Sequence, residues 1–228
     1  MKNHLCKLFV ALSIFLHGAV LAMDFSVHGD VLMMSGTVID GDLPNLKSNL
    51  EANPTIKTIV LRNSYGGHVS TGYAAGELLR QLGMTTVVSG YCISSCSRIF
   101  LGGTNRQFSN ETPQQKTYIG FHGHYDNSGS INTESVEKMG LYNWIVKYTD
   151  DKVDKKLLAQ WIAFRRNTDI VAFFHPSTSF SDGLTVRNCE RFTRANGAPL
   201  RCPGAQPDAL LQGVITTLEQ FTLPASLQ

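Results

Sequence analysis

The sequence predicts an α/β domain built around a largely parallel sheet, and three observations support this class. Segments of strand character alternate with segments of helical periodicity through the first half of the chain. The connections between them are short, as in right-handed βαβ crossovers. Hydrophobic residues make up 43% of the 228 residues, which is enough for one well-packed core and too little for two large domains.

The first strand and helix are bounded by small residues and proline. Residues 31–39 (VLMMSGTVI) form a β-rich segment between Gly29 and Gly41. The helix expected over residues 43–53 has leucines at helical spacing, and the Asn-Pro step after it ends the helix because proline restricts the residue before it. A second strand is predicted over residues 55–63.

The following elements continue the alternation. The glycine-rich break NSYGG precedes a helix expected over residues 69–83, which has apolar residues on or near one face and stops at a glycine. A strand over 84–90, a helix over 93–101 and a strand over 117–123 come next. Beyond residue 130 the pattern turns helical, over residues 133–148 and 155–166, and the part from Asn167 onward is rich in loops.

The charged residues are nearly balanced in sign. The chain has 20 basic and 18 acidic residues, for a net charge of +2. The sequence contains no basic block or stripe of the kind that neutralises phosphates. We therefore expect no nucleic-acid partner.

The first 22 residues have the organisation of a signal peptide. Lys2 and Lys7 give a positive start, the apolar stretch LFVALSIFL follows, and small residues precede a cleavage position after Ala22. The apolar stretch is shorter than the roughly 20 residues that span a bilayer, so no stable membrane span is expected after processing. An uncleaved anchor is the alternative. The mature chain would be one domain over residues 23–228, periplasmic or secreted.

Cleavage would leave four of the five cysteines, because Cys6 departs with the signal peptide. An even number of cysteines in an exported chain predicts two disulfides, with three connectivities to choose from. The pairs that are local in sequence are Cys92–Cys96 and Cys189–Cys202. The second pair would close a loop rich in Gly and Pro that has little core of its own. Zinc binding is disfavoured because the spacings lack a CxxC pair.

Two glycine-rich breaks follow predicted strands, at residues 63–67 and near Gly90. In a parallel α/β sheet, such loops lie at the carboxyl ends of strands, where ligands bind. The first break lacks both the lysine of a P-loop and the spacing of a dinucleotide fingerprint, so phosphate binding is not supported. Consecutive glycines can instead present backbone N–H groups, which an oxyanion hole requires.

Serines and histidines stand near the same edge of the expected sheet. Ser94, Ser95 and Ser97 begin the helix after the second break, and His122 and His124 end a predicted strand. A serine needs a base to react at neutral pH. On residue chemistry alone, the commoner explanation of the serines is structural, because small polar residues are frequent in turns and at helix N-caps. The structural explanation is likewise the commoner one for the two histidines, and a metal pair is a third option, for which the sequence offers no clear further ligands.

The order of motifs points to a family. A G-x-[IV] strand, the NSxGG turn, a helix, a strand ending in G-x-x-x-S, a helix closing on Gly103 and the strand IGFHG follow one another. Over about residues 31–125 this order resembles the Clp protease proteolytic subunit and its crotonase-fold relatives, and exported bacterial members with a C-x-S-x-C core resemble it more. The resemblance implies a ClpP/crotonase-like fold with repeated ββα/βαβ units and a helical, loop-rich C-terminal part.

The resemblance implies a role for each residue around the two breaks. The G-x-x-x-S pattern makes Ser94 the nucleophile, and the IGFHG strand makes His122 the general base. The backbone N–H groups of Ser95 and Gly67, with Gly66 beside it, would form the oxyanion hole.

The cysteines beside Ser94 receive a different role. Neither Cys92 nor Cys96 aligns with the nucleophile, so a cysteine hydrolase is disfavoured. A bridge between them would clamp the turn that holds the serine.

The orienting acid is the part that matches the family least. Asp182 in FSDGLTVRNCERF has the better context, and Asp169 in RNTDIVAFF is the rival. Some branches of the superfamily use a Ser-Lys dyad instead, for which Lys138 is the candidate. Its surroundings, ESVEKMGLY, predict an ordinary solvated helix, so the triad is favoured.

The expected function is an exported serine hydrolase of peptidase type, acting on a peptide or protein by Ser-His(-Asp) acyl transfer. The alternative is a non-catalytic member of the fold that binds peptides or supports assembly. A crotonase-type acyl-CoA enzyme is opposed by export, because coenzyme A is cytoplasmic. No metal or other cofactor is expected. Family members often form rings, so the resemblance suggests a homo-oligomer, whereas the divergent C-terminal part leaves a monomer open.

Overall fold

The computed structural model describes residues 22–110, 113–190 and 202–227. The expected signal peptide therefore lies almost entirely outside the described residues. Across the three described ranges, none of the helices is long and apolar enough to cross a membrane.

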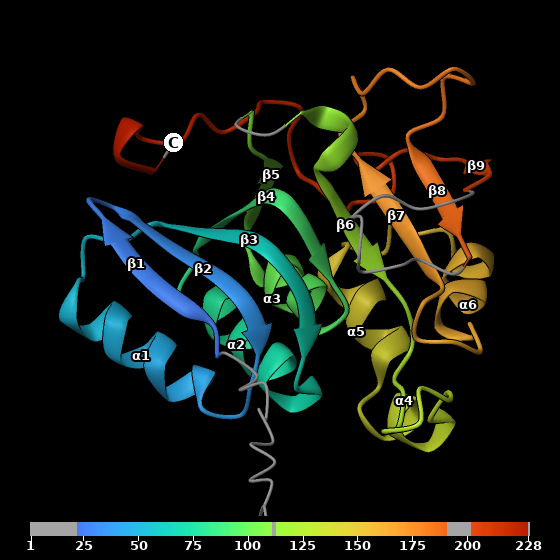
Figure 1. The fold of residues 1–228 in the computed structure, drawn as a ribbon, viewed down its shortest axis with the longest axis horizontal. Coiled ribbons are helices and arrows are strands. Elements are labelled where there is room, and N and C mark those ends of the chain that lie inside the picture. Colours follow the sequence, from blue (N-terminus) through green and yellow to red (C-terminus); the bar gives the residue numbers. More distant parts are fainter. Residues whose placement is uncertain (1–21, 111–112, 191–201, 228) are drawn as a thin grey trace, which may run out of the picture.

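A mixed sheet forms the centre of the molecule (Figure 1). Its strands are β1 (Asp24–His28), β2 (Val31–Val38), β3 (Thr58–Gly67), β4 (Thr85–Ile93), β5 (Asn105–Phe108), β6 (Tyr118–Phe121), β7 (Ile170–Phe174), β8 (Val186–Cys189) and β9 (Gly204–Ala205). They follow the order β1-β2-β3-β4-β6-β7-β8-β9, and β5 pairs with β4. The central strands β2, β3, β4 and β6 run parallel, whereas β1, β7, β8 and β9 pair antiparallel. The α/β class is confirmed, with the parallel part at the centre.

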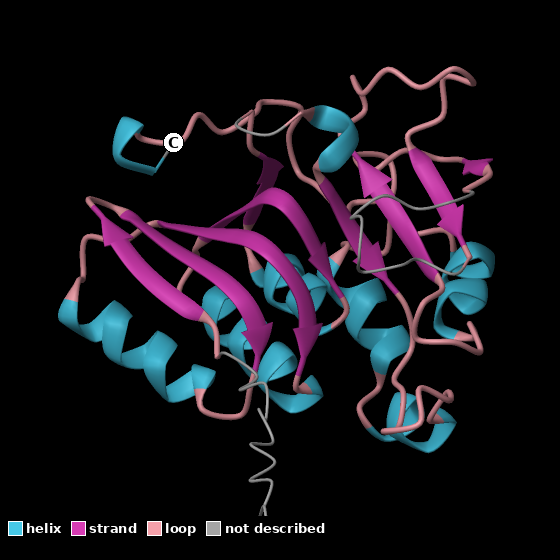
Figure 2. Ribbon diagram, in the orientation of Figure 1, coloured by secondary structure: helices cyan, strands magenta, loops and turns pink. Residues whose placement is uncertain are grey.

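The helices fall into two groups along the chain (Figure 2). The first group is α1 (Asp42–Ala52), α2 (Val69–Gln81) and α3 (Ser95–Gly102), and the second is α4 (Thr133–Lys138), α5 (Leu141–Tyr148) and α6 (Lys155–Ile162). Short 3-10 turns occupy η1 (Gln114–Lys116) and η2 (Ala225–Leu227). The helix expected over residues 133–148 is divided at Gly140, whose positive φ of 61° interrupts helical geometry.

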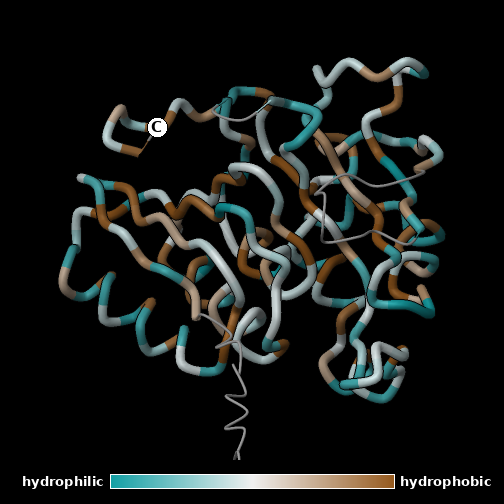
Figure 3. The backbone as a smooth tube through the Cα atoms, viewed as in Figure 1, coloured by the Kyte–Doolittle hydropathy of each residue, from teal (hydrophilic) through white to brown (hydrophobic). Residues whose placement is uncertain are grey.

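The main core lies between the sheet and helices α1, α2 and α3. Leu32 and Leu61 of the sheet belong to one buried cluster with Leu46 of α1, Leu79 of α2 and Ile99 of α3. Helix α1 presents mainly hydrophilic residues on its other side (Figure 3). The leucine spacing that predicted this helix is thus the face that packs on the sheet.

Glycines let α2 approach α3 closely. A Cβ atom on Gly72 would lie 2.7 Å from the Cβ of Ser95, at the start of α3. Cβ atoms on Gly76 and Gly102 would collide with backbone of the facing helix. Any larger residue at these positions would push apart the two helices that follow the glycine-rich breaks.

The C-terminal segment covers the opposite face of the sheet. Leu223 and Leu227 pack on Val31, Val60 and Val87, which lie on three adjacent strands. The loop-rich end of the chain therefore contributes a second, smaller core.

Two arginines attach this segment to the sheet through its backbone. Arg106 of β5 donates hydrogen bonds to the carbonyl oxygens of Gly213 at 2.8 Å and Val214 at 3.1 Å. Arg62 of β3 donates to the carbonyl of Leu227 at 2.9 Å. Buried carbonyls at the end of the chain are satisfied in this way.

The glycine-rich break at residues 63–67 differs from the expectation. β3 continues through it, because Gly66 pairs with Thr37 and Gly67 pairs with Val38 after an irregularity in the register. Asn63, Gly66 and Gly67 have φ values of 49°, 81° and 146°, so the strand is distorted without ending. Its last residues are therefore held in the sheet and are not a free loop.

Candidate active site

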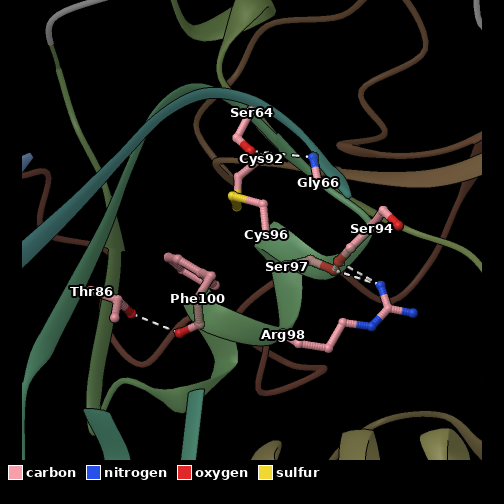
Figure 4. The surroundings of a disulfide bond; sticks show 9 residues. All are labelled: Ser64, Gly66, Thr86, Cys92, Ser94, Cys96, Ser97, Arg98 and Phe100. Carbon is pink, nitrogen blue, oxygen red and sulfur yellow. Dashed lines mark hydrogen bonds between the residues drawn. A yellow bond between two sulfur atoms is a disulfide. The ribbon is translucent and has the colours of Figure 1, made fainter. Parts of the chain in front are cut away.

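Ser94 occupies a strained turn between β4 and α3. Its φ is 58° and its ψ is −126°, in a region that residues other than glycine rarely adopt. The Ser94 N–H donates to the Gly120 carbonyl of β6 at 3.1 Å. Strained residues of this kind persist only where their surroundings hold them, and they gather at functional sites. The side chain of Ser94 points away from the neighbouring disulfide (Figure 4).

The end of β3 lies directly against this turn. A Cβ atom on Gly66 would come within 2.7 Å of the Ser94 Cβ and 2.8 Å of the Ser95 nitrogen. Glycine is therefore required at Gly66 by space as well as by its φ of 81°. The Ser64 hydroxyl accepts a hydrogen bond from the Gly66 N–H at 3.2 Å, which helps to hold the end of β3 in this position. The end of β3 and the start of α3 thus lie close together beside the serine.

A cavity of about 660 Å³ opens next to Ser94. Ser94, His122 and Gly67 all contribute to its lining. The remaining lining residues combine apolar and polar groups: Tyr65, Val69, Ile93, Gly123, His124, Tyr125, Asp126, Asn127, Asn167, Thr168 and Ile170. The cavity has the size of a small-molecule or side-chain binding site.

His122 follows the last residue of β6 and is buried at this cavity, with 6% of its surface exposed. Its ring stacks on that of Tyr125, with 4.9 Å between ring centroids and 27° between planes. Its backbone carbonyl accepts a hydrogen bond from Arg98 at 2.6 Å. The sheet and α3 therefore both fix the position of this histidine.

His124 has the surroundings of a structural histidine. Its Nε2 lies 3.1 Å from the Tyr73 hydroxyl and its Nδ1 lies 2.9 Å from the Ser135 hydroxyl. Burial, together with the positive charge of Arg98, lowers its pKa to about 4, against a hydrogen bond at Ser135 that raises it. With both ring nitrogens engaged, His124 is not available as the second ligand of a metal pair.

The two candidate acids lie at opposite ends of the β6–β7 pair. Asp169 directly precedes β7, and Val171 pairs with Phe121, so Asp169 lies at the end of β6 from which His122 extends. It is 8% exposed and its neighbour Thr168 lines the cavity. Burial and the negative charge of Asp169 both raise the pKa of Tyr125, the residue stacked on His122.

Asp182 lies elsewhere, in the connection between β7 and β8 that begins at the far end of β7. Both of its carboxylate oxygens accept hydrogen bonds from Arg187, at 2.6 and 2.7 Å. This pairing lowers the pKa of Asp182. The structure does not bring this acid to the cavity. Lys138 is exposed at the last residue of α4 and is not among the described residues that line the cavity.

Both cysteine pairs predicted from local spacing lie at disulfide distance. Cys92 and Cys96 are joined across the Ser94 turn with 5.3 Å between Cα atoms (Figure 4). Cys189 and Cys202 are joined with 4.3 Å between Cα atoms. Disulfides form and persist in oxidising compartments, so the pairs are compatible with an extracellular or periplasmic protein.

Arg98 and Tyr125 are the parts of the site that sequence reasoning missed. Arg98 stands in the apolar stretch RIFLGG, where a charged residue within a buried helix was the available signal. Tyr125 follows the IGFHG strand without a pattern of its own.

Comparisons with known proteins agree with this architecture. No protein-family model and no curated protein matches the chain. Among solved structures, ClpP1 from Listeria monocytogenes superposes with a TM-score of 0.52 and 15% identity, over 88% of this chain and 95% of that one. A membrane-bound stomatin-specific protease superposes with a TM-score of 0.43 and 12% identity, over 57% of this chain and 67% of that one. The likeness to ClpP1 shows that the chain has a ClpP-like α/β fold.

Proposed function

We propose that the protein is an exported serine hydrolase of peptidase type, with Ser94 as nucleophile and His122 as general base. The observation that carries the proposal is the strained Ser94 turn opening into a cavity that His122 also lines. A ClpP-like fold is compatible with peptidase chemistry, although fold alone does not define a reaction. Export, with cleavage after Ala22, remains part of the proposal and is supported by the two cysteine pairs.

The reaction is acyl transfer in two stages. The Ser94 hydroxyl attacks the carbonyl carbon of a peptide bond while His122 takes its proton, and the carbonyl electron pair moves onto oxygen. The N–H groups of Gly67 and Ser95 stabilise this oxyanion. When the intermediate collapses, the C–N bond breaks and His122 returns the proton to the leaving amine. A water molecule then gives a proton to His122, attacks the acyl carbon and releases the Ser94 hydroxyl and a carboxylic acid.

We assign the orienting acid to Asp169 in place of Asp182, which the sequence context favours. Asp169 stands at the His122 end of the β6–β7 pair, whereas Asp182 is engaged with Arg187 at the other end. A buried carboxylate beside the base would stabilise the imidazolium formed when Ser94 gives up its proton. An exposed Lys138 offers no such arrangement, because a lysine base requires burial to lower its pKa.

The first experiment measures labelling by a fluorophosphonate probe, in which the serine oxygen bonds to phosphorus and fluoride leaves. We expect wild-type protein to be labelled and Ser94→Ala to lose labelling, because the bond-forming oxygen is gone. His122→Ala and Asp169→Asn should label at least about 100-fold more slowly. Asp182→Asn and Lys138→Ala are the matched controls and should label like wild type.

The outcomes separate the candidate functions. Labelling that persists in Ser94→Ala would exclude this nucleophile. Loss of labelling in Lys138→Ala but not in His122→Ala would select the Ser-Lys dyad. A folded wild-type protein that takes up no probe would favour the non-catalytic peptide-binding module.

A further inference from the structure

Arg98 is a buried cation directly behind the serine turn. It lies in the N-terminal half of α3, and only 2% of its surface is exposed. Burial lowers its pKa, but a guanidinium remains protonated in proteins. Burying a charge is costly unless hydrogen bonds compensate for the lost water, so the contacts of this side chain indicate why it is there.

The guanidinium joins the two segments that carry the proposed nucleophile and base. Nη1 donates to the Ser94 carbonyl at 2.5 Å and to the Ser97 hydroxyl at 3.1 Å. Nη2 donates to the His122 carbonyl at 2.6 Å. The two bonds to carbonyl oxygens are short, and all three are charge-assisted, a class about twice as strong as bonds between neutral groups. Figure 4 shows the side chain reaching back from α3 to the serine turn.

The acceptors are oxygens of neutral groups. They are two backbone carbonyls and a hydroxyl, and Tyr73 interacts with the same guanidinium. In the described part of the chain, no carboxylate forms an ion pair with Arg98. Its positive charge therefore acts on the surrounding peptide groups without local neutralisation.

The contact with the Ser94 carbonyl has a geometric consequence. This oxygen also accepts hydrogen bonds from the Ser97 N–H at 2.9 Å and the Ser97 hydroxyl at 2.6 Å. Because the peptide unit is planar and trans, fixing the Ser94 carbonyl also fixes the Ser95 N–H, which points the opposite way. As the first residue of α3, Ser95 has no acceptor within the helix for that N–H.

We infer that Arg98 is a positioning residue, whose guanidinium orients and polarises the Ser94–Ser95 peptide so that the Ser95 N–H stabilises the oxyanion. Its Nη2 group holds the His122 carbonyl and so keeps the segment that carries the proposed base in place beside the serine turn. A cation on a carbonyl oxygen strengthens the N–H of the same peptide as a donor, because hydrogen bonds in a chain polarise one another. The inference rests on the proposed function and adds a residue that touches neither substrate nor reacting atoms.

Arg106 supplies a matched control in the same molecule. It is also buried, with 1% exposure, and also donates to backbone carbonyls. Its partners are Gly103, Gly213 and Val214, none of which lines the cavity. Substituting Arg106 therefore reproduces the loss of a buried guanidinium without touching the serine turn.

The experiment compares Arg98→Gln, Arg98→Lys and Arg106→Gln with wild type. The measurements are the second-order rate constant of fluorophosphonate labelling, the melting temperature, and the amide proton shift of Ser95 in ¹⁵N-labelled protein. We expect Arg98→Gln to label about 10- to 100-fold more slowly, as when an oxyanion donor is weakened. Arg98→Lys should label at an intermediate rate, since an ammonium keeps the charge but lacks the planar fork.

The control should separate catalysis from stability. We expect Arg106→Gln to lower the melting temperature without slowing labelling. The Ser95 amide proton should move upfield in Arg98→Gln and stay in place in Arg106→Gln.

Equal labelling rates for Arg98→Gln and Arg106→Gln would overturn the inference. If Arg98→Gln does not fold, Arg98→Lys decides, and labelling at the wild-type rate would overturn it. If wild type takes up no probe, the proposed function fails, and the chemical shift of the Ser95 amide proton tests the positioning role separately. A change of this chemical shift in the Arg98 variants supports the positioning role. An unchanged chemical shift overturns it.

Discussion

Several residues around Ser94 have contacts that their residue type does not predict. In the proposed site, Ser95 would contribute a backbone N–H; Gly66 gives space through its lack of a side chain, and the charge of Arg98 lies against peptide groups where a carboxylate would be the common partner. Residue type predicts side-chain chemistry, so the roles of Gly66 and Ser95 came from the family resemblance, and that of Arg98 came from the structure.

His124 carries a prediction about acid stability. Its folded pKa of about 4 lies below its ordinary value of 6.5, so the unfolded chain binds the proton more readily. The contribution of this group is complete above pH 6.5 and is lost as the pH falls toward 4, to a total of about 3 kcal/mol. In His124→Gln, the free energy of unfolding should therefore fall less between pH 6.5 and 4 than in wild type.

Urea denaturation across this pH range checks the difference between the two proteins. His28→Gln is the control, because it removes an imidazole from a half-buried position on β1, outside the buried surroundings that lower the pKa of His124. Parallel curves for wild type and His124→Gln would contradict a neutral, buried His124.

At the scale of elements, the β4–turn–α3 unit is closed by its own disulfide. The Cys92–Cys96 bridge spans four positions, and the Cys189–Cys202 bridge spans 13. In the chain-entropy model the short loop contributes about 2 kcal/mol and the longer one about 3 kcal/mol. The short bridge is thus the weaker contributor to stability, although it encloses the proposed nucleophile.

This contrast gives opposite predictions for two double variants. Cys92→Ser with Cys96→Ser should slow fluorophosphonate labelling, because the strained Ser94 turn loses its clamp, at a modest cost in stability. Cys189→Ser with Cys202→Ser should cost more stability and leave the labelling rate of the folded protein unchanged. Labelling rates and melting temperatures of both variants test this, and unchanged labelling in the first would remove the clamp from the mechanism.

Over the whole molecule, the C-terminal segment is part of the fold. Leu223 is 2% exposed and packs on the sheet, whereas Leu218 in the same segment is 52% exposed. Leu223→Ala should lower the free energy of unfolding by about 2–5 kcal/mol, the usual cost of a cavity in a core. Leu218→Ala should change it by less than about 0.5 kcal/mol. Urea denaturation measures both, and equal values would mean that the second core adds no stability.

How much of the structure the sequence could predict depends on how far apart in sequence the interacting residues lie. The alternation of strands and helices up to Phe121, the serine turn and both cysteine pairs depend on local patterns, and the structure contains them. β7 was missed because its residues, IVAFF, are all buried and show no alternation, and β8 was missed because its four residues are too few for a clear pattern. The relation of Asp169 to His122 depends on the pairing of β6 with β7, which joins segments far apart in sequence.

In the proposed exported hydrolase, the disulfide across the Ser94 turn would make maturation depend on the compartment that the chain reaches. In the proposed enzyme, a newly made chain has reduced cysteines and an open turn until it reaches an oxidising compartment. Oxidation would then play the part that removal of a propeptide plays in other hydrolases, and no mature peptidase would form in the cytoplasm. Protein produced in a reducing cytoplasm would accordingly be the precursor form, and an activity screen on such material would examine the wrong species.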